Sequence, residues 1–147
     1  MVDVGAKDVT DRRAVARAVV RMAPDTAALV EAGDAPKGDV IGTARIAGIQ
    51  AAKRTPDLVP LCHPIAIHAV TVDLQVGDGA VEIAATVRTA DRTGVEMEAL
   101  TSVTVAALAL IDMVKAIDPA AVISDVRVEE KTGGKTGAWR RPRTSRQ

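Results

Sequence analysis

The segment VTVDLQVGDGAVEIAATV, residues 70–87, decides the fold class of this chain. Apolar side chains occupy every second position on both sides of Gly77-Asp78-Gly79, at 70, 72, 74 and 76 and again at 81, 83, 85 and 87. Strict alternation places such side chains on one face of a strand, and the Gly-Asp-Gly sequence supplies the turn. The stretch therefore predicts a β-hairpin with one buried face.

The segments around this hairpin predict an α+β fold. Apolar residues alternate with polar ones over 14–22, which favours a strand, although helical spacing fits nearly as well. Helices are predicted over 26–31, ending at Gly33, over 39–53, with Asp39 as N-cap, and from about 95 to 117. A last strand follows over 121–128. Apart from the split first helix, this is the order of a ferredoxin-like antiparallel sheet with helices packed on one face.

The composition narrows the classes of function. The 147 residues include 19 Lys+Arg and 19 Asp+Glu, one Trp, and no Tyr or Phe. Zero net charge and missing aromatic side chains argue against general nucleic-acid binding and against an anionic membrane surface. A single cysteine excludes an internal disulfide framework and a multi-Cys zinc module. With no apolar run of about 20 residues, we expect a soluble, cytoplasmic protein.

One domain is expected over residues 1–137, because no repeat or linker divides the chain. Residues 138–147 form a basic tail that we expect to be mobile.

Leu61-Cys62-His63-Pro64 is the first candidate for chemistry, because Pro60 and Pro64 stiffen the backbone around one of only two histidines. Neighbours in sequence seldom point their side chains at each other, so a Cys62–His63 nucleophile pair is disfavoured. No spaced Cys/His set provides the ligands of a zinc site. His63 is then either a functional group or a loop histidine that only hydrogen-bonds the backbone.

Asp112 and Lys115 lie three residues apart on one helical face. They form either an ordinary surface ion pair or a pair that transfers protons to and from a substrate. Glu96 and Glu98 begin the same predicted helix, where acidic side chains also favour the helix dipole. In a continuous helix, Glu98 and Asp112 are about 21 Å apart. Either the two glutamates stand on a loop that folds back, or two subunits complete one site.

Residues 131–137, Lys-Thr-Gly-Gly-Lys-Thr-Gly, could cradle phosphate, because glycines expose backbone N–H groups and lysines add charge. The segment is not a Walker A motif, because Glu129 stands where its first glycine is required and no helix is predicted to follow. A merely solvated basic segment is the alternative.

Several blocks of the chain, in one order from residue 1 to about 137, closely resemble the cyclic pyranopterin monophosphate synthase family of molybdenum cofactor biosynthesis. They are residues 1–4, 37–40, 47–53, 61–64 and 93–101, then Asp112-Met113 with Lys115, and Lys131 with Gly133-Gly134-Lys135. The resemblance implies a ferredoxin-like subunit in a homohexamer, a trimer of dimers with sites at subunit interfaces. It also implies a lyase that converts (8S)-3′,8-cyclo-7,8-dihydroguanosine 5′-triphosphate to cyclic pyranopterin monophosphate and diphosphate.

The resemblance also implies which residues act. The catalytic residues would be Asp112, Lys115, Lys131, His63 and Lys37. The substrate-binding residues would be Leu61, Cys62, His63, Glu96, Met97, Glu98, Arg12 and Lys135. No redox step is required, so no flavin, nicotinamide or iron–sulfur cofactor is expected, and no residue is assigned as a metal ligand. The competing hypothesis is a non-catalytic ferredoxin-like oligomer that binds a phosphorylated metabolite through the Lys/Gly segment.

Overall fold

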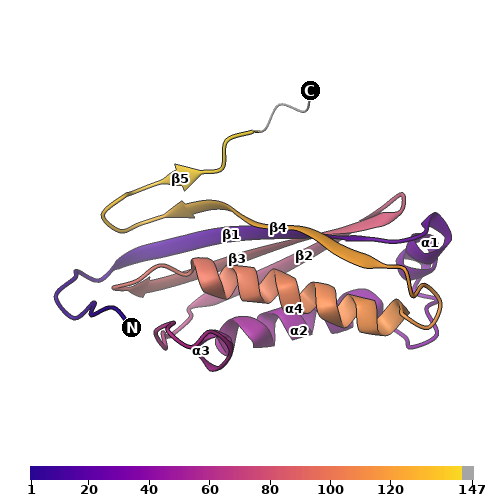
Figure 1. The fold of residues 1–147 in the computed structure, drawn as a ribbon, viewed down its shortest axis with the longest axis horizontal. Helices are drawn as coiled ribbons and strands as arrows, with labels where there is room; N and C mark the ends of the chain where they lie inside the picture. The colour runs from indigo at the N-terminus through magenta and orange to yellow at the C-terminus, as the bar shows by residue number, and fades with distance from the viewer. Residues whose placement is uncertain (144–147) are drawn as a thin grey trace.

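The computed structural model describes residues 1–143, which form a five-stranded antiparallel sheet with helices on one face (Figure 1). The strands follow the spatial order β2-β3-β1-β4-β5 and span Thr10–Arg21 (β1), Ala69–Gly77 (β2), Ala80–Asp91 (β3), Val122–Thr132 (β4) and Trp139–Arg140 (β5). The helices span Pro24–Ala32 (α1), Val40–Lys53 (α2), Thr55–Leu58 (α3) and Glu96–Val114 (α4). The predicted ferredoxin-like α+β fold is confirmed, and residues 14–22 lie mostly in a strand.

The hairpin formed by β2 and β3 has the predicted register. Val76 pairs with Val81 and Gly77 with Ala80, which leaves Asp78 and Gly79 as the two-residue turn. Gly79 has a φ of 71°, as this kind of turn requires. The helix signals are confirmed as well, because the Asp39 side chain accepts a hydrogen bond from the Gly42 N–H at 2.9 Å.

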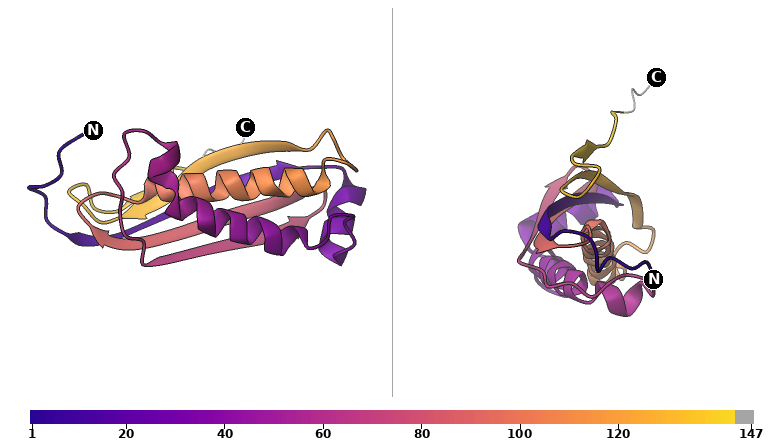
Figure 2. Two further views of the ribbon diagram at one scale, coloured as in Figure 1. Left: turned by 90° about the horizontal axis from the view of Figure 1, so that it is seen from below. Right: turned by 90° about the vertical axis from the view of Figure 1, so that its left-hand side faces the viewer.

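The core consists of small and branched side chains. On β1, Ala14, Ala16, Ala18 and Val20 are each at most 1% exposed and face the helices. Figure 2 shows α2 and α4 lying side by side across this face of the sheet. At Gly48 of α2, an added Cβ would lie 3.0 Å from the Ser102 carbonyl oxygen of α4, so the two helices are in close contact. A core with almost no aromatic side chains is compatible with such close packing.

Helix α4 is long and apolar enough to cross a membrane by length and composition alone. In this fold it packs on the sheet beside α2, and Ala99, Val103, Ala107 and Leu110 are fully buried. Its apolar surface is therefore that of a core helix.

Besides the bounds of β1, which begins at Thr10, and of α4, which ends at Val114, three segments differ from the sequence-based predictions. The residues after Arg54 form the one-turn helix α3, because Pro56 is acceptable in a first helical turn. Strand β4 continues to Thr132, beyond the predicted end at Val128, so Lys131 lies on a strand. Trp139 pairs with Lys131 in β5, so the start of the basic tail belongs to the sheet, whereas residues 144–147 lie outside the described part of the chain.

Candidate active site

Helix α4 separates the predicted site residues into two groups. It runs without interruption from Glu96 to Val114, which rules out a loop that folds Glu96 and Glu98 back onto Asp112. The sixteen helical steps from Glu96 to Asp112 correspond to about 24 Å at 1.5 Å per residue. One group lies at the end of α4 near the amino terminus and the other at the end near α1 (Figure 1).

Asp112 accepts hydrogen bonds from two lysines, and we call these three residues the Asp112 cluster. Its Oδ2 lies 2.7 Å from Lys37 Nζ and its Oδ1 lies 2.6 Å from Lys115 Nζ. Lys37 comes from the turn before α2, and Lys115 is the C-cap of α4. The hydrogen bond from Lys115, then that from Lys37, and then their charges lower the pKa of Asp112 to about 2. The cluster therefore holds an ionised carboxylate between two ammonium groups, about half exposed to solvent.

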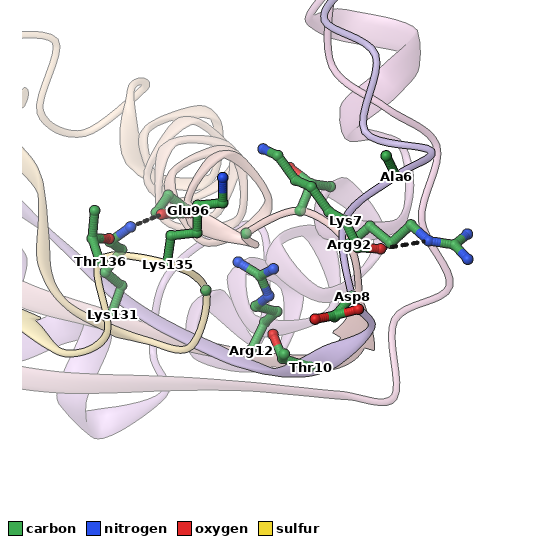
Figure 3. A pocket seen from close by; sticks show the side chains of 13 residues that line it. Ala6, Lys7, Asp8, Thr10, Arg12, Arg92, Glu96, Lys131, Lys135 and Thr136 are labelled. Atoms are coloured by element: carbon green, nitrogen blue, oxygen red, sulfur yellow. Dashed lines mark hydrogen bonds and ion pairs between the residues drawn. The ribbon is translucent and has the colours of Figure 1, made fainter.

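A cleft of about 630 Å³ lies at the opposite end of α4, and we call it the Glu96 cleft (Figure 3). Its charged lining comprises five cationic side chains and two carboxylates: Lys7, Arg12, Arg92, Lys131 and Lys135 against Asp8 and Glu96. Lys131 Nζ lies 3.3 Å from Glu96 Oε1. The surplus of positive charge suits a polyanionic ligand such as a phosphate chain.

The glycines after β4 bring the loop close to Arg12. Gly134 has a φ of 80°, and a Cβ there would lie 2.3 Å from Arg12 Nη1. At Gly133, with a φ of 95°, a Cβ would lie 2.1 Å from the Asp11 carbonyl oxygen. Neither position can accept a side chain without displacing β1 or Arg12. The Lys-Thr-Gly-Gly-Lys pattern therefore serves close packing against β1, whatever ligand the cleft holds.

A second cavity, of about 430 Å³, adjoins the Glu96 cleft and shares Lys7 and Glu96 with it. Besides Glu96, its lining contains four predicted substrate-binding residues: Leu61, Cys62, His63 and Met97. The His63 Nε2 lies 2.8 Å from the Val2 carbonyl oxygen, so the amino-terminal segment holds the imidazole. The structure therefore brings the proline-bracketed loop next to the Glu96 cleft and away from the Asp112 cluster.

Glu98 lines neither cavity. Its side chain is 1% exposed and lies beneath Cys62, whose Sγ–H donates to Glu98 Oε1 over 3.6 Å. Burial, and then the charge of Glu98 and this hydrogen bond, raise the pKa of the Cys62 thiol to about 11. A thiol with so high a pKa is a poor nucleophile at neutral pH. Burial also raises the pKa of Glu98.

Sequence reasoning missed several residues of the Glu96 cleft. Lys7, Asp8 and Thr10 come from the amino-terminal segment and the start of β1, and Arg92 comes from the turn before α4. The Arg92 Nε donates to the Lys7 carbonyl oxygen at 3.0 Å, which joins segments 85 residues apart. The sequence signal that could have found Arg92 was its positive charge in the turn before the predicted helix. Within residues 1–143, no group of three or more His, Cys, Asp or Glu side chains could hold a metal ion.

This fold, with lysine–carboxylate clusters at both ends of one core helix, defines a ferredoxin-like α+β protein equipped for acid/base chemistry on an anionic ligand. The chain belongs to the MoaC family, whose family model matches residues 1–134.

Three relatives illustrate the similarity. A cyclic pyranopterin monophosphate synthase of Streptomyces coelicolor is 64% identical over 141 residues, covering 96% of this chain and 83% of that protein. The protein of the same name from Nocardioides is 59% identical over 145 residues, covering 97% and 89%. Cyclic pyranopterin monophosphate synthase 2 of Mycobacterium tuberculosis is 57% identical over 141 residues, covering 96% and 84%.

Proposed function

We propose that this chain is a lyase that converts (8S)-3′,8-cyclo-7,8-dihydroguanosine 5′-triphosphate to cyclic pyranopterin monophosphate and diphosphate. The name shared by relatives that are 57–64% identical supports the reaction. The single structural observation that carries the chemistry is the Asp112 cluster, in which one carboxylate lies within hydrogen-bonding distance of two ammonium groups. Such an arrangement supplies both proton donors and an ionised acceptor without any cofactor.

The Asp112 cluster acts as the proton-transfer centre in this proposal. Opening the purine ring and closing the pyranopterin ring require protons to be removed at some atoms and delivered at others. Lys37 and Lys115 donate and recover protons, and Asp112 holds both ammonium groups at 2.6–2.7 Å in a fixed geometry. With a pKa of about 2, Asp112 stays ionised throughout the neutral range and maintains this geometry.

The Glu96 cleft receives the phosphate chain. Arg12, Lys131 and Lys135 provide charge-assisted hydrogen bonds and stabilise the departing diphosphate. Lys131 is paired with Glu96 before the substrate arrives, so a phosphate must compete with or join this ion pair. His63, in the adjoining cavity, lies on the side toward the base and the sugar. Neither cavity is lined by a Trp, Tyr or Phe ring, so hydrogen bonds hold the guanine-derived part.

The two clusters meet across a subunit interface in this proposal. About 24 Å of α4 separates Glu96 from Asp112 in one protomer, too far for both to act on one small molecule. A homo-oligomer, the hexameric trimer of dimers that the family resemblance implies, places the Asp112 cluster of one copy against the Glu96 cleft of another. Apolar side chains exposed on the described surface provide area for such contacts: Ile46, Leu61 and Leu108 are 55–70% exposed. We place this soluble enzyme in the cytoplasm.

The test is turnover of the authentic cyclised triphosphate. We expect release of diphosphate together with an oxidisable, fluorescent pterin. Binding of the triphosphate without diphosphate release would contradict the enzyme and favour the non-catalytic metabolite-binding protein.

A mixing experiment tests the shared site. Asp112→Asn and Lys131→Met are each expected to be inactive, because each breaks a different half of every site. After subunit exchange at equal amounts, a site shared across a two-fold interface regains about a quarter of wild-type activity, since half of the pairs are mixed and each has one intact site. No recovery after verified exchange would contradict the shared site.

A further inference from the structure

Helix α1 begins without a cap from its own sequence. Its N-cap residue is Ala23, whose side chain cannot accept a hydrogen bond, although Ser, Thr, Asp and Asn are preferred at this position. In a capping box, a Glu or Gln three residues further on accepts the N-cap backbone N–H. Thr26 occupies that position here. The helix therefore lacks the two local acceptors of a capping box.

Asp118, which lies 95 residues further along the chain, supplies an acceptor. It is 8% exposed, and its Oδ2 accepts from the Ala23 N–H at 2.8 Å, while its Oδ1 accepts from the Ala120 N–H at 3.2 Å. The hydrogen bond from Ala23 is the largest cause of the lowered pKa of Asp118. Burial acts against it, and the Thr26 hydroxyl and the Ala120 N–H add to it. The Asp118 carboxylate thus takes the role of the acidic side chain of a capping box, but it comes from the turn after α4.

This turn directly follows the residues of the Asp112 cluster. The Asp118 N–H bonds to the Val114 carbonyl oxygen at 2.9 Å, and the Ile117 N–H bonds to the same oxygen at 3.0 Å. Val114 is fully buried and precedes Lys115. The Asp118 carboxylate is therefore held closely to the end of α4 that carries Asp112 and Lys115.

The remaining member of the cluster, Lys37, lies beyond the other end of α1. Between α1 and α2 the chain makes a turn, in which the Gly38 N–H bonds to the Ala35 carbonyl oxygen at 2.9 Å. From this turn, Lys37 Nζ reaches Asp112 Oδ2 at 2.7 Å. Hydrogen bonds therefore join the α1 segment to the end of α4 at two places, Asp118 at the beginning of the segment and Lys37 near its end.

Apolar packing also holds α1 in place. Val30 and Ala35 belong to the same buried cluster as Met113 of α4, and α1 contacts β2 and β3. Just before α1, the Met22 N–H bonds to the Gly79 carbonyl oxygen at 2.9 Å, which ties this end to the hairpin turn. Hydrophobic contacts are non-directional, so they keep α1 on the sheet without fixing its exact distance from α4. A hydrogen bond to a charged carboxylate is directional and fixes that distance.

We propose that Asp118 is a positioning residue for the Asp112 cluster: by capping α1 from the turn after α4, its carboxylate sets the distance over which Lys37 reaches Asp112. The proposal rests on the proposed function only in that the Asp112 cluster transfers protons. Asp118 acts through the placement of Lys37 and does not touch the substrate. Because the Glu96 cleft lies at the opposite end of α4, losing this contact affects proton transfer more than substrate binding.

The reactivity of Lys37 reports on this placement without any turnover assay. Trace acetylation with acetic anhydride at neutral pH, read by mass spectrometry, gives its rate relative to Lys53, an exposed lysine at the end of α2. A carboxylate neighbour favours the unreactive ammonium form, so Asp112→Asn sets the upper limit of the Lys37 rate. We expect Asp118→Ala to raise this rate at least about twofold toward that limit. Asp118→Asn keeps an acceptor for the Ala23 N–H and should stay within about twofold of wild type.

Ala23→Pro tests the same hydrogen bond from the donor side. Residue 23 has a φ of −61°, which proline adopts, so the change removes the N–H with little backbone strain. We expect the same rise in the Lys37 rate as in Asp118→Ala, and no further rise in the double variant, because both changes break one hydrogen bond. If Asp118→Ala does not fold, Ala23→Pro decides.

Thr55→Val is the control for a general loss of stability. It removes a fully buried hydroxyl that donates to the Ala52 carbonyl oxygen at 3.0 Å, at the start of α3. The Lys37 rate should stay within about twofold of wild type. An equal rise in this control overturns the proposal, and so does a Lys37 rate in Asp118→Ala or Ala23→Pro that stays within about twofold of wild type.

Turnover then connects the placement of Lys37 to the reaction. We expect Asp118→Ala to lower kcat at least about tenfold while KM stays within about twofold, and Asp118→Asn to recover most of kcat. A rise in KM at unchanged kcat would show an effect on substrate binding and would contradict the proposal. If the wild-type protein does not turn over, the proposed function fails, whereas the acetylation rates still test whether Asp118 places Lys37.

Discussion

The two ends of α4 present carboxyl groups in opposite environments. Asp112 is about half exposed and bonded to two lysines, which lower its pKa to about 2. Glu98 is buried beneath a thiol, and burial raises its pKa. The helix dipole alone would favour a negative charge near Glu98 and disfavour one near Asp112, so local partners and burial override it here. One helix thus carries a carboxyl group with a lowered pKa at one end and a carboxyl group with a raised pKa at the other.

The difference separates an accessible carboxylate, which the proposed function uses, from a buried one that lines neither cavity of the protomer. An ionised carboxylate between two ammonium groups holds proton donors where a bound molecule can reach them, whereas Glu98 is only 1% exposed in the protomer. In the proposed function, the end near α1 therefore carries the proton transfer and the end near the amino terminus binds the phosphate chain.

The largest expected effect is the loss of turnover in Asp112→Asn. Removing the negative charge releases both ammonium groups from a fixed geometry, so we expect turnover to fall by about 10²–10⁴-fold, the usual contribution of acid/base catalysis. Steady-state diphosphate release measures it.

Asp125→Asn is the matched control for that change. Asp125 has a similar exposure and pairs with Arg21 at 3.0 Å, and its φ of 54° is tolerated by asparagine. Turnover should remain at the wild-type rate. Equal losses in the two variants would contradict a special role for the Asp112 cluster.

Weaker substrate binding is expected when cations of the Glu96 cleft are removed. Lys135→Met deletes one charge at the cleft wall, so we expect KM to rise about tenfold, in line with about 1.5 kcal/mol for a charged hydrogen bond. Lys53→Met, at the end of α2 and outside the cleft, is the control and should leave KM unchanged. A large fall in kcat with unchanged KM would instead place Lys135 in the proton-transfer step.

The sequence identified the charged residues at the two ends of α4 better than it identified the residues from distant segments that lie beside them. Alternation over 70–87 was sufficient for the hairpin, and helical spacing together with the resemblance indicated Asp112, Lys115 and Glu96. Local patterns could not show that Lys37 reaches Asp112 across 75 residues, or that Lys7 and Arg92 join the cleft. Such contacts arise only when strands bring distant segments together. Likewise, β4 extends past Val128 because pairing with β1 continues to Thr132, a tertiary effect that local propensity does not contain.

Two glycines allow the packing of the cleft loop to be tested separately from its charge. Gly134→Ala places a Cβ against Arg12, whereas Gly137, with a φ of 62°, has open space around the corresponding position. Both changes strain a left-handed backbone by about 1–2 kcal/mol, so both should lower Tm by similar small amounts. Only Gly134→Ala should also raise KM, because its Cβ displaces the Arg12 guanidinium. Gly137→Ala should leave KM unchanged. Equal KM values in the two variants would show that Arg12 does not contact substrate.

The smallest expected effect is on the titration of Asp112 in Lys37→Met. Loss of this ammonium removes the second-largest cause of the lowered pKa, so the pKa should rise from about 2 toward the ordinary 3.8 and remain below it while Lys115 is present. Because the folded-state pKa is depressed, the stabilisation from Asp112 is complete above about pH 4 and is lost as pH falls toward 2, and the variant should lose less over that interval. Carboxyl NMR titration measures the shift. An unchanged pKa would mean that Lys115 alone sets the charge of Asp112, which would remove Lys37 from the proton-transfer centre.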